Sequence, residues 1–279
     1  MFTGTGSYSY DASGDPTQLA QAAQTFNAQH QVTSQVSTIS RVGTASAGDN
    51  GAGSTLTLTL PSGVQANDQI LLAVTLPGNQ TIKSTPSGYT QVGSYSSGTG
   101  ASNTQLVLYR RTAQTGDTSV TVTFSKTFAK AATLIVYRGV NPVTPIDASS
   151  NGTTASGTSV AAPSVTTTKG TDELVVALAA SSSAAGTWTV PSQMTTQRSQ
   201  AGGPTIASAV ADQALTSSGP TGSRTATFST TGSLVAAMVA LQPAQTSYGY
   251  DSLGDRTSIT SPGGTHEIRV FDELASLVE

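Results

Sequence analysis

The sequence contains no cysteine and only two histidines among its 279 residues. Without thiols there can be no disulfide bridges, thiol nucleophiles or zinc-thiolate sites. His30 and His266 both lie in polar stretches outside the central part of the chain, where we expect exposed, idle side chains. The glycines occur in Ser/Thr-rich turns without a following helix, so no phosphate-binding or dinucleotide-binding motif is present. The sequence therefore predicts a protein that is not an enzyme and needs no cofactor.

Charge is also scarce. Charged residues make up 10% of the chain and the net charge is -3, whereas about a quarter of an ordinary soluble domain is charged. The 12 basic residues are scattered apart from Arg110 and Arg111. A phosphate backbone binds clustered basic residues, so we expect no nucleic-acid partner. A hydrophobic content of 36% with low net charge also indicates a folded chain and not a disordered one.

No apolar run reaches the 18 or so residues of a membrane span, so we expect no membrane insertion. The first five residues lack the basic and apolar regions of a signal peptide. Weakly charged strands rich in Ser and Thr suit an extracellular environment. We expect an extracellular or cell-surface location, with the export signal outside this sequence.

Between residues 51 and 243, short β-branched segments alternate with turns of Gly, Pro, Ser and Asn, a pattern typical of a β-sandwich. The expected strands of the first half are Thr55–Leu60, Gln69–Leu76, Tyr89–Tyr95, Thr104–Ala113, Ser119–Phe124 and Ala132–Val140. Those of the second half are Ser159–Ala162, Glu173–Ala179, Met194–Gln200, Ile206–Ala214, Arg224–Ser229 and Ser233–Leu241.

The two series follow each other at a constant offset. Aligning Asp68 with Asp172 also places Phe124 on Phe228, about 104 residues further on, which indicates a tandem duplication. The pattern leaves open whether the copies form two sandwiches or interleave into one larger jelly roll.

The predicted fold class is all-β, with a duplicated antiparallel sandwich or jelly-roll-like region flanked by hairpins. One short helix is expected between Asp15 and Asn27, because a capping Asp precedes a Pro and small apolar residues follow at helical spacing. The expected divisions are 1–40 for a repeat, helix and linker, 41–147 and 148–243 for the two copies, and 244–279 for further repeats.

A phrase of the form Tyr-x-Tyr-Asp-x-x-Gly frames the duplicated region. It stands at Tyr8–Gly14 and Tyr248–Gly254, and a looser copy stands at Ile268–Leu274. The phrase resembles the YD repeat of RHS and wall-associated proteins, although Asp255-Arg256 replaces the usual Asn and Arg, and Val270-Phe271 replaces the last Tyr-x-Tyr. The resemblance implies a β-wrapped shell or filament outside bacteria, with neighbouring YD repeats of a longer chain as partners. The final unit then looks truncated.

The central region is similar to Ser/Thr-rich sandwich inserts of bacterial surface and phage structural proteins, a looser likeness that rests on phrases such as Leu134–Val140. By these two resemblances the chain looks like a duplicated sandwich inserted into a YD-repeat polypeptide. The leading hypothesis for its function is a non-catalytic module that binds carbohydrate or another cell-surface ligand. A structural spacer without a ligand is the alternative, and a glycan-active enzyme is the third.

Carbohydrate binding needs exposed aromatic rings beside polar side chains. The candidate ligand-binding residues are Trp188, Tyr89, Tyr95 and Arg110, and each also has an ordinary structural interpretation, because a lone Trp in a sandwich commonly packs in the core and an Arg commonly covers a strand edge. Exposure of the three aromatic side chains together would favour binding, and their burial would favour a spacer. An enzyme would require paired carboxylates, and the equivalent residues Asp68 and Asp172 are more easily explained as turn formers.

The sequence offers candidate residues for two further chemistries. Asp11 with Asp15, and Asp251 with Asp255, place carboxylates four residues apart around a Gly; this spacing suits a calcium loop, but a tight turn explains it better, so no metal site is predicted. An internal lysine crosslink would use Lys83, Lys126, Lys130 or Lys169, and no spacing identifies a site for it.

Overall fold

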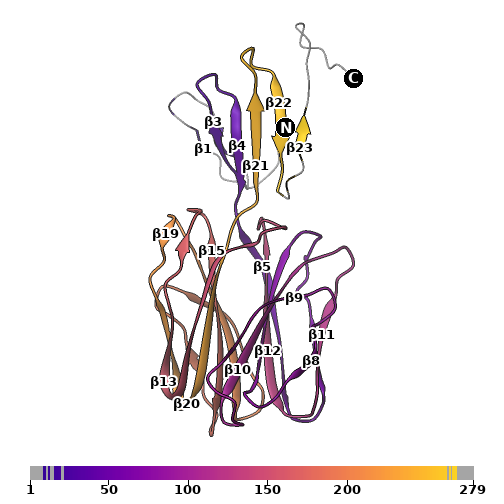
Figure 1. Ribbon diagram of the computed structural model, residues 1–279, viewed down its shortest axis with the longest axis vertical. Helices are drawn as coiled ribbons and strands as arrows, with labels where there is room; N and C mark the ends of the chain where they lie inside the picture. The colour runs from indigo at the N-terminus through magenta and orange to yellow at the C-terminus, as the bar shows by residue number, and fades with distance from the viewer. Residues whose placement is uncertain are drawn as a thin grey trace. The chain divides into compact units, whose positions relative to one another are not determined.

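The computed structural model describes residues 9–10, 12, 16–19, 22–262, 264 and 266–268. These residues form β-strands and loops only, as Figure 1 shows, and they include no helix of membrane-spanning length. The chain divides into two compact units. The sandwich unit comprises Ser40–Arg138 and Ile146–Leu241, and the hairpin unit comprises Met1–Ile39, Gly139–Pro145 and Gln242–Glu279.

The helix expected between Asp15 and Asn27 is wrong. β2 (Pro16–Leu19) and β3 (Ala22–Phe26) occupy its place, and β3 pairs with β4 (Val32–Ser37). Ala22 is buried while Ala23 and Thr25 are exposed, which follows the two-residue period of a strand. The small apolar face of this segment gave a helix little to bury, so pairing with a neighbouring strand decided the outcome.

The hairpin unit contains one antiparallel sheet in the order β1-β2-β3-β4-β21-β22-β23. Its remaining strands are β1 (Ser9–Tyr10), β21 (Gln245–Tyr250), β22 (Arg256–Thr260) and β23 (His266–Ile268). β4 and β21 are direct neighbours, with Gln245 opposite Val36. The whole sandwich unit is therefore inserted in the chain between two adjacent strands of one sheet.

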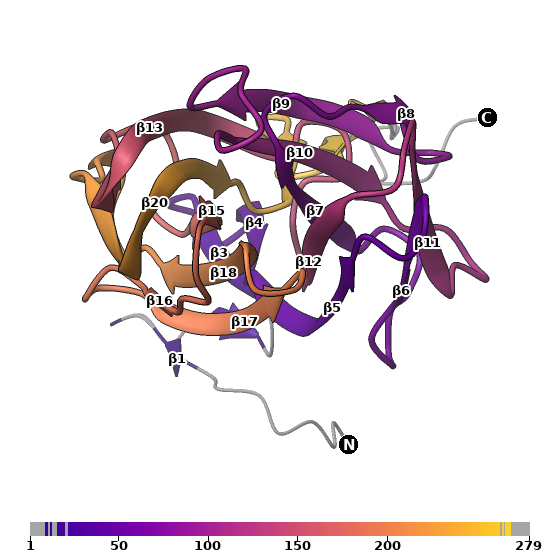
Figure 2. The same ribbon diagram turned by 90° about the horizontal axis from the view of Figure 1, so that it is seen from below.

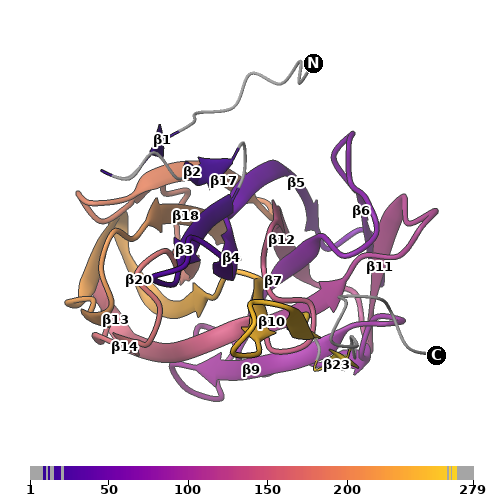
Figure 3. The same ribbon diagram turned by 90° about the horizontal axis from the view of Figure 1, so that it is seen from above.

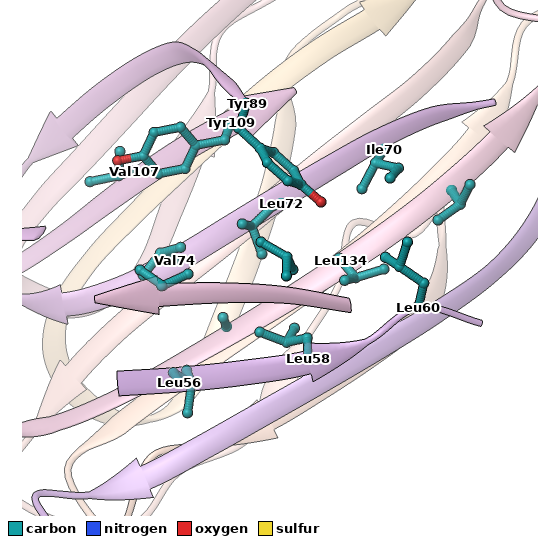
Figure 4. Close-up of a cluster of buried hydrophobic side chains, with 14 of the residues drawn as sticks. Leu56, Leu58, Leu60, Ile70, Leu72, Val74, Tyr89, Val107, Tyr109 and Leu134 are labelled. Atoms are coloured by element: carbon teal, nitrogen blue, oxygen red, sulfur yellow. The ribbon is translucent and has the colours of Figure 1, made fainter. Parts of the chain in front are cut away.

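The first copy, Ser40–Arg138, forms a sandwich of two sheets. The larger sheet has the order β5-β12-β7-β10-β9, and the smaller sheet has the order β6-β11-β8. The strands of the larger sheet are β5 (Ser40–Asn50), β7 (Gln69–Pro77), β9 (Thr90–Ser96), β10 (Thr104–Thr112) and β12 (Ala129–Arg138). Those of the smaller sheet are β6 (Thr55–Thr59), β8 (Ile82–Ser84) and β11 (Ser119–Phe124). Large side chains such as Leu58, Leu72, Tyr109 and Leu134 fill the space between them (Figure 4).

The second copy, Ile146–Leu241, repeats this plan with longer strands. Its main sheet has the order β13-β20-β15-β18-β17, β16 pairs with β20, and β14 pairs with β19. The strands are β13 (Ile146–Ala162), β14 (Thr166–Thr167), β15 (Glu173–Ser182), β16 (Trp188–Thr189), β17 (Thr195–Ala201), β18 (Ile206–Ala214), β19 (Gly219–Pro220) and β20 (Arg224–Leu241). β13 and β20 each take the place of two strands of the first copy.

Strand registers relate the two copies residue by residue. Tyr137 of β12 lies opposite Gln69 of β7, and Leu241 of β20 lies opposite Glu173 of β15. Each residue of the second pair therefore follows its counterpart in the first pair by the same number of positions along the chain. No sheet in the described residues combines strands from both copies. The copies are therefore two sandwiches and not one interleaved jelly roll. They span residues 40–138 and 146–241, whereas the expected boundary lay between 147 and 148.

The two large sheets pack face to face, as the end-on view in Figure 2 shows. Alternate residues of the central strands face the other copy and enclose a space of only about 10 Å³. These residues are Leu71, Ala73, Leu108, Thr133, Ile135, Val175, Ala177, Val210, Ala237 and Val239. A space of this size holds at most about one water molecule, so the packing is close. The central strands are therefore buried on both faces.

The edges of the large sheets also meet across this interface. β17 runs beside β5, as Figures 2 and 3 both show, and the hydroxyl of Ser46 donates a hydrogen bond of 2.8 Å to Oε1 of Gln200. β9 is the counterpart of β17 and β13 is the counterpart of β5, and these two strands make the equivalent contact at the other edge. The sandwich unit is thus a stack of four β-layers held by three apolar interfaces.

Candidate functional site

The candidate residues Tyr89 and Trp188 pack against different cores. Tyr89 is only 9% exposed in the core of the first copy, where burial raises the pKa of its hydroxyl to about 12. The ring of Trp188 lies 4.9 Å from that of Phe228 at the core of the second copy. The indole Nε1 is buried and has no hydrogen-bond partner in the described part of the chain. Neither ring forms an open stacking platform.

Tyr95 and Arg110 are half-buried and lie apart. The ring of Tyr95 covers Gly93 of the same strand, where an added Cβ would come within 2.2 Å of the tyrosine Oη. Tyr95 lies opposite Leu106 of β10, four positions before Arg110. This spacing separates the two residues by about 13 Å along the strand. The four candidate residues therefore do not converge on one site.

Asp68, which begins the β7 region, is neutralised by an arginine. Its carboxylate is 2% exposed and accepts hydrogen bonds from Nε and Nη2 of Arg138 at 2.9 and 2.8 Å. The amide N–H of Gln65 donates a third at 2.8 Å. Two parallel bonds to a guanidinium are among the strongest interactions available to a buried carboxylate. In the first copy this position is fully satisfied.

Asp172, the equivalent residue of the second copy, has no such partner. It is 1% exposed, and no described donor reaches either carboxyl oxygen. The residue at the equivalent position to Arg138 is Gln242, which carries no charge. Burial, followed by the neighbouring Asp147 carboxyl, raises the pKa of Asp172 to about 7. Asp147 accepts bonds from the amide and hydroxyl of Thr168 at 2.5 and 2.7 Å, and these bonds lower the pKa of Asp147. Asp172 is therefore the member of the pair that holds a proton more readily.

A second group of polar side chains bridges the two copies. The hydroxyl of Tyr137 donates to Asp212 at 2.8 Å, Gln197 donates to the other carboxyl oxygen, and Arg41 forms an ion pair with Asp212 at 3.5 Å. Burial and the charge of Asp212 raise the pKa of Glu173 to about 8, against an opposing effect of Arg41. These groups hold the ends of facing strands together, and they leave Glu173 protonated at neutral pH.

Lys130 is fully buried at the corner of the first copy. Its ammonium group donates to Oδ2 of Asp49 at 2.8 Å and to the carbonyl oxygens of Gly53 and Phe128 at 2.7 and 3.1 Å. Phe124 and Phe128 place their rings within 5.5 Å of the same nitrogen. The interaction with Lys130 lowers the pKa of Asp49 to about 2. Three acceptors match the three protons of the ammonium group, which is the arrangement of a structural ion pair.

A cleft of about 550 Å³ opens where the two copies meet at one end of the sandwich unit. Its walls are the end of β7, the loop 97–103, the bulged middle of β13, the end of β15, the loop before β18 and the bend of β20. Eight of its 13 lining residues carry hydroxyl groups and none is charged or aromatic. The lining residues are Pro77, Ala101, Ser102, Ala155, Ser156, Ser181, Ser182, Ser183, Thr205, Ile206, Thr231, Gly232 and Ser233. Sequence reasoning missed this site because its residues come from six separate segments.

Asp251 forms a tight turn, the interpretation that the sequence favours over a calcium loop. One carboxyl oxygen of Asp251 accepts the amide protons of Leu253 and Asp255 at 2.9 and 2.8 Å, and Gly254 has a φ of 94°. This arrangement closes the hairpin of β21 and β22. Asp11 and Asp15, most of the first Tyr-x-Tyr-Asp phrase and most of the last one lie outside the described residues. Within the described residues no group of three or more acidic or histidine side chains is placed to hold a metal ion.

No family model, no curated protein and no solved structure matches this chain.

Proposed function

We propose that this chain is a non-catalytic structural module, in which a rigid double sandwich is inserted into a sheet of YD-type hairpins. The observation that carries the proposal is the pairing of β4 with β21 across the insertion. Gln245, Thr246 and Ser247 lie opposite Val36, Gln35 and Ser34, so the sheet continues through the insertion point without a missing strand. An insert carried in this way adds bulk to a repeat polypeptide and leaves its strand order intact.

The placement of the candidate aromatic residues supports this role over ligand binding at those residues. Tyr89 is buried, Trp188 packs on Phe228, and Tyr95 covers a glycine of its own strand. The close packing between the copies supports rigidity, because a core with almost no free volume resists deformation. The proposed setting is a longer chain at the bacterial cell surface, with neighbouring YD repeats as partners.

The insertion can be tested by engineered disulfides, since the natural chain has no cysteine to interfere. Val36→Cys with Gln245→Cys places two thiols on directly opposed residues, whose Cβ atoms should be about 5 Å apart. We expect this pair to oxidise readily while the thermal unfolding of the sandwich unit changes by less than about 2 °C. Val36→Cys with Thr246→Cys is the matched control, because neighbouring residues of a strand point to opposite faces.

The structural role itself is tested by replacing Thr38–Pro243 with a two-residue Asn-Gly turn in the Val36→Cys, Gln245→Cys background. We expect the shortened chain to form the same disulfide, because a tight turn suffices to join adjacent antiparallel strands. Failure of the disulfide in the full chain would contradict the observed register. Failure only in the shortened chain would show that the sheet depends on the insert, and the insert would then not be a separable module.

A further inference from the structure

We propose that the cleft between loop 97–103, β15 and β20 binds a neutral, polyhydroxylated ligand, a glycan, at a site separate from the aromatic residues considered above. Several hydroxyl groups on its walls have no hydrogen bond to any described residue. These belong to Ser102, Ser156, Ser183, Thr205 and Thr231. Each hydroxyl can both donate and accept, which matches the hydroxyl groups of a sugar.

The lining selects the chemical class of the ligand. No charged residue lines the cleft, so it offers nothing to a phosphate, a carboxylate or a cation beyond neutral dipoles. Its lining includes no aromatic residue, and Ile206 is its one large aliphatic side chain, so it offers little to the large apolar side chains of a peptide. Its volume of about 550 Å³ lies in the range of small-molecule sites and accommodates two or three sugar rings.

The duplication shows that this opening is not imposed by the fold. At the equivalent corner of the first copy the loop 202–205 fills the space. An added Cβ at Gly202 would lie 2.1 Å from the carbonyl oxygen of Lys130, and one at Gly203 would lie 2.0 Å from Oδ1 of Asn50. The two glycines allow this loop to lie directly on the corner of β5 and β12.

Loop 97–103 behaves differently at the corner of the second copy. It is anchored through Ser233, whose hydroxyl contacts that of Ser97 and accepts a bond of 2.8 Å from the amide of Thr104. The hydroxyl of Thr104 donates to the carbonyl of Ser233 at 2.6 Å. This anchor holds the rim in place and leaves the cleft beside it open. The same topology thus produces one closed corner and one open corner.

The experiment titrates the full chain with neutral hexasaccharides of glucose in α-1,4, β-1,4 and β-1,3 linkage and with chitohexaose, followed by calorimetry. Without an aromatic platform we expect weak, saturable binding of at least one of them, with a Kd of about 1 mM. Ser183→Arg and Thr231→Arg place a long side chain in the cleft and should weaken binding at least 10-fold. Thr115→Arg, in the exposed loop between β10 and β11, is the matched control and should leave binding unchanged.

Folding of each variant is checked by its thermal unfolding, so a loss of binding with an unchanged Tm reports on the cleft. Two results would overturn the proposal: no saturable binding of any hexasaccharide by the folded chain at 10 mM, or binding that survives both arginine variants. Preferential binding of a neutral Ser/Gly-rich peptide would also overturn the assignment to glycans. None of these results bears on the pairing of β4 with β21, so the structural role is judged separately.

Discussion

The two copies of the sandwich share their strand order and register but bury different side chains. Of the 17 residues in each buried cluster, two are alanines in the first copy and eight are alanines in the second. At several of these alanine positions the first copy has a larger side chain: Leu58, Leu76 and Val136 are the counterparts of Ala162, Ala180 and Ala240. Buried apolar area contributes about 25 cal/mol per Å², so the first copy has the larger intrinsic contribution to stability. The arrangement of the strands tolerates this difference because alternation, more than side-chain size, specifies which face is buried.

The copies also differ in how their strands pass through the corner of the sandwich. In the second copy β13 and β20 run through the bend as continuous strands with register shifts. In the first copy β5 and β6 are separate strands, as are β11 and β12, and Lys130 with Asp49 occupies the break. In the second copy, Leu234 and Thr154 form the pair that corresponds to Lys130 and Asp49. A broken corner frees backbone carbonyls, and the buried ammonium group satisfies two of them.

The largest effect is expected from exchanging the corner residues of the first copy for those of the second. Lys130→Leu removes the ammonium donor from two carbonyl oxygens and leaves the Asp49 carboxylate with only the amide bonds of Ala52 and Gly53. This variant should lower Tm by about 8 °C. Lys130→Leu with Asp49→Thr removes the unpaired acid and should recover at least half of that loss. Differential scanning calorimetry measures both. Equal Tm values for the single and double variants would show that Asp49 is not the group left unsatisfied.

The contact between the copies is tested by two neighbouring residues of β12. Leu134 faces the core of the first copy and Ile135 faces the second copy. Because both side chains are completely buried, Leu134→Ala and Ile135→Ala should each cost about 3 kcal/mol in urea denaturation. A cost below about 0.5 kcal/mol for Ile135→Ala, typical of surface positions, would mean that the sheets do not pack face to face.

The arginine that distinguishes Asp68 from Asp172 can be removed. Arg138→Gln introduces the residue found at the equivalent position of the second copy, and it leaves the buried Asp68 carboxylate without its two strongest bonds. We expect a loss of about 2 kcal/mol in denaturation at pH 7. Adding Asp68→Asn to this variant should restore part of the stability. An Arg138→Gln variant with the same stability as the natural chain would show that the pair contributes nothing.

The smallest effect, and the one with a pH signature, concerns the second copy. The pKa of Asp172 is raised from 3.8 to about 7 and that of Glu173 from 4.5 to about 8. Between about pH 4 and pH 8 the folded state therefore binds more protons than the unfolded chain. The free energy of unfolding falls as the pH rises through this range. Asp49 acts oppositely: its pKa is lowered to about 2, and its stabilisation is lost as the pH falls through 3.8 toward 2.

Thermal unfolding across pH should accordingly reach its highest Tm near pH 4 to 5. Asp172→Asn with Glu173→Gln should raise Tm at pH 8 by about 3 °C and flatten the slope above pH 5. Asp68→Asn is the corresponding change in the first copy and should lower Tm at pH 8, because it removes a carboxylate that accepts two bonds from Arg138. An unchanged slope in the Asp172→Asn, Glu173→Gln variant would assign the pH dependence to other groups.

Much of the fold was predictable because it depends on local patterns. The pattern predicts strands at Gln69–Leu76 and Glu173–Ala179, and the observed strands begin at the same residues and end one and three residues later. The constant offset between Asp68 and Asp172 indicates the duplication. The sequence also carries a signal for the packing of the copies: Ile70–Leu76 and Leu174–Ala180 are almost continuously apolar, which is typical of strands buried on both faces. It could have indicated the face-to-face packing of the copies.

The candidate site could not be derived in the same way. Tyr89 and Trp188 are candidates because aromatic rings can bind sugars, but a small sandwich also uses such rings to complete its core. Which role each ring takes depends on Phe228, Arg111 and the opposite sheet, none of which is adjacent to it in sequence. The hydroxyl-lined cleft gave no signal, because isolated serines and threonines occur throughout this chain.

By itself, the sequence determined the all-β class, the duplication, the absence of thiol chemistry and the low charge, since composition and period act over short distances along the chain. Only the tertiary structure decided that Ala22–Phe26 is a strand and that Asp68 gains an arginine while Asp172 is buried beside Asp147 without one. It also decided that one corner is filled by Gly202 and Gly203 while the other stays open. Each of these outcomes depends on groups brought together from distant segments. Burial, charge pairing and free volume are properties of that assembly, and no short stretch of sequence contains them.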